Sequence, residues 1–346
     1  MRHVISKQLD QAPFTRLSPE HGDSGLKKDT FMYLLKTLTR ILAVLVATCA
    51  GIDSAVAQSS NTPLELVVLG SGGPGAVGRA ASCYLVLIDG TARILVDAGP
   101  GAFARLGEAK LTLADTDIVL LTHLHVDHAG ELPGLFKARA VSGGASVVFK
   151  VWGPAGTAER HQGAYFPSTS RFLDLLFGTK GAFAYLRDFA APITLQAHDI
   201  PAEVQLAPVP QAILKENGLL IRAIAGHHGD APAVIYRIDY AGKSITFSGD
   251  IDAKGLPGLR TIAKGTDLLV FNSAVLDPPG SPEILYTLHT PPRAIGELAR
   301  DAGVRSLLLS HISPAVEENK DAVLESIKRS YQGLVSLAAD RARVLP

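Results

Sequence analysis

Residues 122–130 read Thr-His-Leu-His-Val-Asp-His-Ala-Gly, and this spacing of three histidines and an aspartate is the strongest signal in the sequence. It directly follows a run of apolar residues that is typical of a buried strand. Because alternate residues of an extended chain point to the same side, His123 and His125 can bind one metal ion together. Asp127 and His128 fall in the turn that follows and can face a second ion. The chain has only 11 histidines, so chance does not explain this spacing.

Imidazole and carboxylate groups together form a ligand set that suits Zn²⁺, although iron and manganese accept similar ligands. Three more motifs of this kind follow along the chain. They are Gly-His-His-Gly-Asp at 226–230, Ser-Gly-Asp at 248–250 and Ser-His-Ile-Ser at 310–313. A Gly-Asp pair at a strand end is also an ordinary turn. The Ser-Gly-Asp motif is therefore interpreted as metal-binding only because the other motifs are present.

The run at 122–130 resembles the signature of the metallo-β-lactamase superfamily, and the other motifs follow in the family's order over residues 64–312. The segments LGSGGPG (69–75), with Arg79, and ILVDAGPG (94–101) are similar to the opening of the ribonuclease Z and arylsulfatase-like branch. The resemblance implies an α/β fold, a four-layer αββα sandwich, and two Zn²⁺ ions per chain. Asp97 would support the metal-binding loop from behind.

The resemblance also implies a set of seven metal ligands. The first ion takes His123, His125 and His228, the second takes Asp127, His128 and His311, and the two share Asp250. His227 competes with His228, which is favoured because it lies eight residues before Tyr236. Two catalytic roles follow from the same resemblance: Asp127 orients a metal-bridging hydroxide, and His289 protonates or stabilises the leaving oxygen. His161 and His198 match no motif.

Short apolar runs between glycine, proline and aspartate predict ten strands, at 64–70, 83–89, 92–97, 117–122, 146–152, 220–225, 233–240, 243–249, 267–272 and 305–310. Helices are predicted at 291–303, where two prolines open the segment, and at about 315–331. A helical insertion at about 153–190 interrupts this pattern. Its apolar side chains are expected to cover a partly apolar substrate: Phe166, Phe172, Leu173, Leu175 and Leu176.

Residues 1–57 have the pattern of an N-terminal extension and signal peptide, and the hydrolase domain is expected at 58–346. Basic residues precede an apolar run, and Ala-Val-Ala at 55–57 is typical of a cleavage site. Cleavage after Ala57 predicts a periplasmic or secreted protein without stable membrane association, and an uncleaved anchor is the alternative. Met1 and Met32 are both candidate start residues.

The function that these observations favour is an exported esterase of small phosphodiesters or aryl sulfate esters. No nucleic acid is expected as a partner, because residues 58–346 carry 26 basic and 28 acidic side chains. In addition, only a short hairpin separates His228 from Asp250, where ribonuclease Z proteins carry a long arm. The alternatives are a lactonase or β-lactamase-like amide hydrolase, a tRNA 3′-processing endonuclease, an iron-dependent redox relative and a non-catalytic binding relative. A homodimer is compatible with the sequence.

Overall fold

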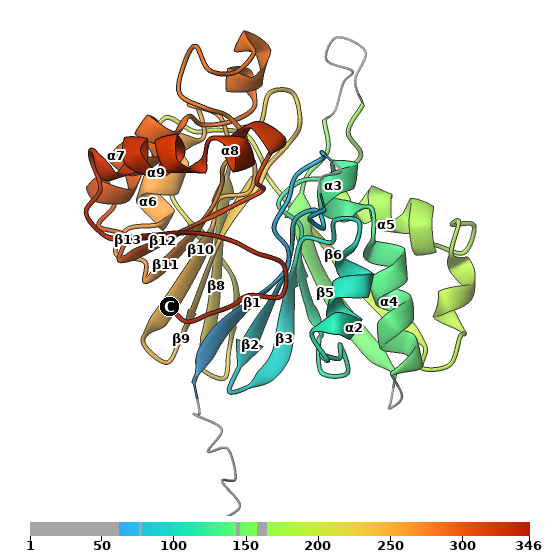
Figure 1. Ribbon diagram of the computed structural model, residues 1–346. Helices are drawn as coiled ribbons and strands as arrows, with labels where there is room; N and C mark the ends of the chain where they lie inside the picture. Colours follow the sequence, from blue (N-terminus) through green and yellow to red (C-terminus); the bar gives the residue numbers. More distant parts are fainter. Residues whose placement is uncertain (1–61, 76–77, 143–145, 158–164) are drawn as a thin grey trace, which may run out of the picture. The chain divides into compact units, whose positions relative to one another are not determined.

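The computed structural model describes residues 62–75, 78–142, 146–157 and 165–346 (Figure 1). They belong to one unit of the chain, residues 59–346. The predicted extension and signal peptide, residues 1–57, lie outside the described residues, as does His161. Within the described ranges, no helix is long and apolar enough to cross a lipid bilayer.

The first sheet is built on the apolar runs of the first half of the chain. Its central strands are buried on both faces, which explains why their sequences are almost continuously apolar. The strand order is β14-β1-β2-β3-β4-β5-β6, antiparallel as far as β3 and parallel from β3 to β6. The strands are β1 (Leu64–Gly70), β2 (Cys83–Ile88), β3 (Thr91–Val96), β4 (Ile118–Leu120), β5 (Val147–Pro154), β6 (Ile193–Ile200) and β14 (Arg343–Val344).

The second sheet has a similar plan. Its order is β13-β12-β11-β10-β9-β8-β7, antiparallel from β7 to β10 and parallel from β10 to β13. The strands are β7 (Gln211–Glu216), β8 (Leu219–Ala225), β9 (Val234–Tyr240), β10 (Lys243–Phe247), β11 (Leu268–Asn272), β12 (Ser306–Ser310) and β13 (Leu334–Leu337).

Three apolar clusters join these sheets and the helices into four layers. One cluster fills the space between the sheets, and the other two join each sheet to its own helices. Figure 1 shows α2 (Ala102–Glu108), α4 (Leu132–Val141) and α5 (Thr169–Phe177) outside the first sheet. Outside the second lie α6 (Leu256–Ile262), α7 (Pro292–Asp301), α8 (Pro314–Glu318) and α9 (Lys320–Lys328). The predicted αββα sandwich is confirmed.

Two helical predictions are refined by the structure. The predicted helix at 315–331 is divided into α8 and α9 because Asn319, at φ −118° and ψ 27°, leaves the helical conformation. In the region of the predicted insertion, α5 and the 3₁₀ helix η1 (Ala184–Arg187) pack on the outer face of the first sheet. Leu173 and Phe177 of α5 are buried there among core residues. A second 3₁₀ helix, η2 (Glu283–Thr287), precedes α7.

Candidate metal centre

His123 and His125 lie in the loop between β4 and the short helix α3 (Val126–Ala129), directly beyond the carboxyl end of β4. Their ring centroids are 4.7 Å apart, and the ring of His228 lies 4.9 Å from His123 and 5.0 Å from His125. One nitrogen of each of the three histidines lies within 4.8 Å of the other two. These three nitrogens are therefore close enough to hold one metal ion, as the sequence predicted for the first ion.

The second predicted ligand set also comes together. Asp127 and His128 occupy α3, and they meet Asp250, which follows β10, and His311, which follows β12. The Oδ2 atom of Asp127 lies 3.2 Å from Nε2 of His311 and 3.7 Å from Nε2 of His128. All four side chains are buried. Their arrangement matches a second ion position.

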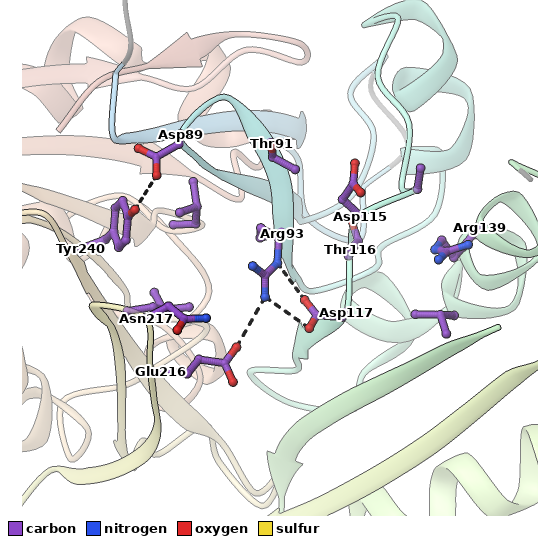
Figure 2. A pocket seen from close by; sticks show the side chains of 14 residues that line it. Asp89, Thr91, Arg93, Asp115, Thr116, Asp117, Arg139, Glu216, Asn217 and Tyr240 are labelled. Carbon is purple, nitrogen blue, oxygen red and sulfur yellow. Dashed lines mark hydrogen bonds and ion pairs between the residues drawn. The ribbon is translucent and has the colours of Figure 1, made fainter. Parts of the chain in front are cut away.

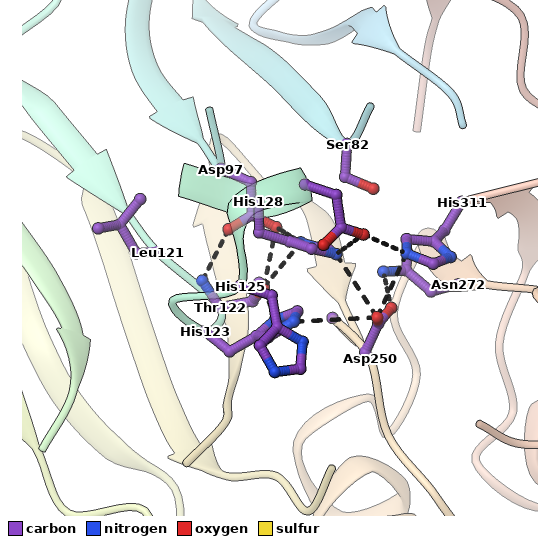
Figure 3. Close-up of polar contacts among 12 residues, drawn as sticks. Ser82, Asp97, Leu121, Thr122, His123, His125, His128, Asp250, Asn272 and His311 are labelled. Carbon is purple, nitrogen blue, oxygen red and sulfur yellow. Dashed lines mark hydrogen bonds and ion pairs between the residues drawn. The ribbon is translucent and has the colours of Figure 1, made fainter. Parts of the chain in front are cut away.

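The carboxylate of Asp250 stands between the two groups (Figure 3). Its Oδ2 atom faces five histidine nitrogens at 3.3 to 4.0 Å, belonging to His311, His128, His228, His123 and His289. A single carboxylate oxygen surrounded in this way can neutralise charge on both sides of itself. This is the geometry that a bridging ligand requires.

Backbone conformation helps to explain how these side chains are held. Gly249 has φ +57°, and a Cβ atom there would lie 2.7 Å from Cβ of Thr122, so the turn that presents Asp250 requires glycine. Asp97 and His311 are non-glycine residues at φ +55°. The left-handed conformation costs an L-residue about 1–2 kcal/mol, and the surrounding hydrogen bonds and packing must supply it.

Two hydrogen bonds fix the orientation of the histidine rings. Nδ1 of His128 lies 2.8 Å from Oδ2 of Asp97, and Nδ1 of His228 lies 2.8 Å from the carbonyl oxygen of Leu288. Because these oxygens accept, each Nδ1 carries a hydrogen, and each ring turns its Nε2 atom toward Asp250. Burial disfavours the charged ring of His128, but the carboxylates of Asp250 and Asp97 outweigh it and raise the pKa of His128 well above 6.5. Asp97 also accepts from the amide and hydroxyl of Thr122, as expected for a residue that supports the loop from behind.

Sequence reasoning missed one polar neighbour of the cluster. The Nδ2 atom of Asn272 donates a hydrogen bond of 2.7 Å to Oδ1 of Asp250, and Asn272 is 5% exposed. The only signal was a polar residue at the end of an otherwise apolar run, LLVFN. This signal becomes meaningful once β10 and β11 are known to be neighbouring parallel strands that end at the same edge.

The structure separates the two adjacent histidines of the GHHGD motif. His228 is 2% exposed and lies in the cluster, whereas His227 is half-buried and its Nδ1 is 2.7 Å from Oδ2 of Asp252. His227 is therefore held away from the first ligand group by Asp252. The exposed ring of His198 stacks on Trp152 at 4.9 Å, outside the cluster.

His289 lies between the rings of His228 and His311. With His228 and Asp250 it forms a third group whose ligand atoms lie within 4.8 Å of one another. Its Nδ1 atom is 4.0 Å from Oδ2 of Asp250 and has no hydrogen-bond partner among the described residues. Burial is the main cause that lowers the pKa of His289 to about 4. At neutral pH the ring is therefore neutral and can donate one hydrogen bond, which favours stabilising a leaving oxygen over delivering a proton from an imidazolium ion.

The donor set fits divalent metal ions. Within the described part of the chain, Nε2 of His123 and Nε2 of His128 are buried without any hydrogen-bond partner, which is costly unless another group binds them. Burial also lowers the pKa of His123 and of His125, so both rings are in the neutral form that a metal ion binds. Histidine nitrogens with aspartate oxygens suit Zn²⁺ well.

The apolar side chains of the predicted insertion divide between the core and the site. Phe166 reaches the cluster, with its ring centroid 5.8 Å from that of His125. Leu173 is 3% exposed in the core, Phe172 and Leu176 pack against the same core, and Leu175 is exposed. Of the five residues expected to cover the substrate, Phe166 is therefore the one in contact with the candidate centre.

Known proteins resemble this chain in sequence and in fold. The ribonuclease Z of Mycobacterium avium (strain 104) is 29% identical over 291 residues, which cover 81% of this chain and 98% of the relative. The metallo-β-lactamase fold protein YhfI from Bacillus subtilis has a TM-score of 0.59 at 18% identity. The short form of human tRNase Z has a TM-score of 0.60 at 18% identity. Each structural match covers 82% of this chain and 99% of the other.

These relatives contradict the prediction that no nucleic acid is a partner of this chain, because the matched sequence is that of a ribonuclease Z and one matched fold is that of a tRNase Z. The prediction relied on the near-neutral charge of residues 58–346 and on the short hairpin between His228 and Asp250. The total charge of a protein does not determine the electrostatic field at one site. A centre that binds divalent cations attracts phosphate groups in a neutral protein as well.

A protein-family model also matches the central region of the sequence. Residues 92–312, which contain all seven predicted ligands, match the model of the β-lactamase superfamily domain. The match includes β3 to β12 and therefore parts of both sheets. Together with the buried histidine and aspartate cluster, it establishes that the chain belongs to the β-lactamase superfamily of metal-dependent hydrolases.

Proposed function

We propose that this protein is a two-metal phosphodiesterase whose substrates include RNA. The observation that carries the proposal is the position of Asp250, whose Oδ2 atom faces five histidine nitrogens at 3.3 to 4.0 Å between two ligand groups. The likeness to ribonuclease Z over 98% of that relative's length supports phosphodiester bonds as the target. Zinc is the proposed metal, with iron and manganese as alternatives.

The seven predicted ligands would hold the ions: His123, His125, Asp127, His128, His228, Asp250 and His311. When bound, two divalent cations supply an ionised water near neutral pH and positive charge for the oxygens of a phosphodiester. Asp127 is buried beside His311, and its carboxylate can accept a hydrogen bond from the attacking water and orient it. His289 is placed to donate a hydrogen bond to the departing oxygen.

Phe166 would form the wall of the substrate site next to His125. A planar aromatic ring at this place suits a base or an aryl group next to the scissile bond. Between His228 and Asp250 the chain contains only the hairpin of β9 and β10, so a large separate arm for gripping RNA is not found in this interval. This observation favours a second candidate substrate class, small phosphodiesters.

The test uses one purified sample reconstituted with Zn²⁺. The substrates are an RNA hairpin with a 3′ single-stranded extension, bis(p-nitrophenyl) phosphate, an aryl sulfate, a lactone and nitrocefin. We expect cleavage of both phosphodiesters. His125→Ala should abolish it, whereas His198→Ala, which alters a histidine outside the cluster, should not. Hydrolysis of the lactone, sulfate or nitrocefin without either phosphodiester would overturn the proposal.

A further inference from the structure

His228 and Asp250 lie in two loops that the second sheet does not join directly. The loop between β8 and β9 carries His228, the loop after β10 carries Asp250, and β9 separates β8 from β10 in the sheet. The Nε2 atom of His228 nevertheless lies 3.7 Å from Oδ2 of Asp250. The carbonyl of Leu288 orients the ring of His228, and Asn272 orients the carboxylate. Neither of these contacts joins the two loops to each other.

His227 and Asp252 join the two loops by a pair of hydrogen bonds, here named the His227–Asp252 clasp. The amide of Asp252 donates a hydrogen bond of 2.8 Å to the carbonyl oxygen of His227. The Nδ1 atom of His227 lies 2.7 Å from Oδ2 of Asp252, whose Oδ1 atom accepts a bond of 2.8 Å from the amide of Lys254. Asp252 is 5% exposed, and both of its oxygens are satisfied within the protein. The clasp therefore connects the loops through backbone and side chain together.

Close packing around the clasp leaves the two loops little freedom to move relative to each other. A Cβ atom at Gly226 would lie 3.2 Å from Cγ2 of the buried Ile251, and one at Gly255 would lie 3.1 Å from the amide nitrogen of His227. Interiors packed this densely transmit small displacements to their neighbours. Each end of the clasp is one or two residues from a predicted ligand. A shift of either loop would therefore change the spacing of the two ligands.

We propose that the His227–Asp252 clasp sets the separation of His228 and Asp250, and through it the affinity of the centre for metal. The proposal rests on the metal centre of the proposed function and adds two positioning residues to it. Neither His227 nor Asp252 belongs to a candidate ligand group within the described ranges. Polar residues that hold ligands in place typically change metal affinity or activity about 10- to 100-fold when they are removed.

A contact with substrate is the rival role for His227. Its side chain lines two cavities of about 950 and 570 Å³, which share His227, Gly229, Asp230 and Lys254. The two roles differ in what they change. A substrate contact would raise KM and leave the affinity for metal as it is, whereas a positioning role lowers the affinity for metal and kcat.

The test starts from the whole zinc-loaded protein and measures its affinity for Zn²⁺ by competition with a chromophoric chelator. His227→Ala and Asp252→Ala should each bind Zn²⁺ about 10- to 100-fold more weakly than the wild type. His227→Asn should restore the affinity to near the wild-type value, because its amide nitrogen can donate to Asp252 in place of Nδ1. The double alanine variant should bind about as weakly as the weaker single variant, because residues that act through one contact are not additive.

Lys254→Ala is the local control. Lys254 is exposed and lines the same two cavities, but only its backbone amide reaches Asp252. The substitution removes the charge and keeps that amide, so the affinity for Zn²⁺ should equal that of the wild type.

Glu216→Ala is the control for a contact that serves stability alone. Glu216 of β7 pairs with Arg93 of β3 at 3.4 Å and with Lys150 of β5 at 2.9 Å, and so joins the two sheets. Figure 2 shows its contact with Arg93. Glu216 lies before the start of β8, whereas His228 follows the other end of that strand. Its removal should leave the affinity for Zn²⁺ unchanged, whatever it does to Tm.

Two results would overturn the proposal. The first is a folded His227→Ala variant with wild-type affinity for Zn²⁺, whether only its Tm or only its KM for bis(p-nitrophenyl) phosphate has changed. The second is an equal loss of affinity in His227→Asn and His227→Ala, which would exclude the hydrogen bond to Asp252 as the cause. If Asp252→Ala does not fold, the two variants of the half-buried His227 still decide the outcome. Metal affinity is measured without substrate, so a failure here is distinct from a failure of the proposed phosphodiesterase activity.

Discussion

Asn272 donates a hydrogen bond of 2.7 Å to Oδ1 of Asp250, whereas the five histidine nitrogens face the other carboxylate oxygen, Oδ2. The bond fixes the rotation of the carboxylate and so keeps its Oδ2 atom at the centre of the cluster. Polar groups in this position behind a metal ligand influence how tightly the ion is held.

Replacing Asn272 should therefore weaken metal binding without unfolding the protein. For Asn272→Ala we expect about 10- to 100-fold lower metal affinity, measured by competition with a chromophoric chelator. The control is Asn217→Ala, which changes an asparagine of the β7–β8 hairpin far from the histidines. Unchanged affinity in Asn272→Ala would show that Asp250 is held by its other neighbours alone.

Removal of the imidazole ring should have different effects on metal binding and turnover at His289 and at His125. His125→Ala should strip metal and abolish turnover, because His125 belongs to a three-histidine ligand group. His289→Ala should keep its metal and lower kcat about 10²- to 10³-fold, the usual effect of losing one hydrogen bond to a departing oxygen. Elemental analysis measures the metal content of each variant, and steady-state kinetics measures its kcat. Loss of metal in His289→Ala would make this residue a ligand.

Asp340, in the loop before β14, should contribute stability that depends on pH. Burial raises its pKa, but hydrogen bonds from the Ala80 amide, from Ser71 and from Arg105 outweigh this and leave the pKa below 3.8. The folded pKa is therefore below the unfolded one. The stabilisation is complete above the unfolded pKa and is lost as the pH falls through the folded pKa.

For Asp340→Asn we accordingly expect a loss of about 1–3 kcal/mol at pH 7, the worth of hydrogen bonds to a charged group. The difference from wild type should shrink below about pH 4, when the wild-type carboxylate takes up its proton. Urea unfolding of metal-free protein from pH 7 to pH 3 measures both quantities. A difference that stays constant down to pH 3 would mean that the charge of Asp340 is not the stabilising feature.

The N-terminal segment gives a prediction that concerns processing. If residues 1–57 act as a cleaved signal peptide, N-terminal sequencing of the protein recovered from an expressing bacterium should begin at Gln58. The Ala57→Leu variant should prevent cleavage, because signal cleavage sites need small residues. An unprocessed N-terminus that begins at Met1 or Met32 would instead be the result expected for an anchor or a non-exported chain.

The strands that the sequence predicted and those that it missed differ in a regular way. All ten predicted strands exist, whereas β6, β7, β13 and β14 were not predicted, and these four are the edge strands of the two sheets. Central strands are buried on both faces and are continuously apolar. Edge strands such as β7, with the sequence QAILKE, are half exposed and carry polar residues that also suit a loop.

The candidate site shows a similar limit. The seven predicted ligands meet because each motif follows a strand end, and those ends gather at one edge of the sandwich. The choice between His227 and His228 could not be derived from the residues themselves, since neighbours in an extended chain point to opposite sides. Asp252 pairs with His227 outside the cluster, and the carbonyl of Leu288 orients His228 toward it. Both contacts come from other parts of the chain.

The pairing of β14 with β1 also has a consequence for biosynthesis. Leu66, near the start of the domain, is paired with Val344 of β14, which lies 278 residues further along the chain. Until β14 has been translated, β1 has an open hydrogen-bonding edge. The first sheet can therefore be completed only after the strands of the second sheet have been synthesised, and a chain that stops before β14 would expose this edge to aggregation.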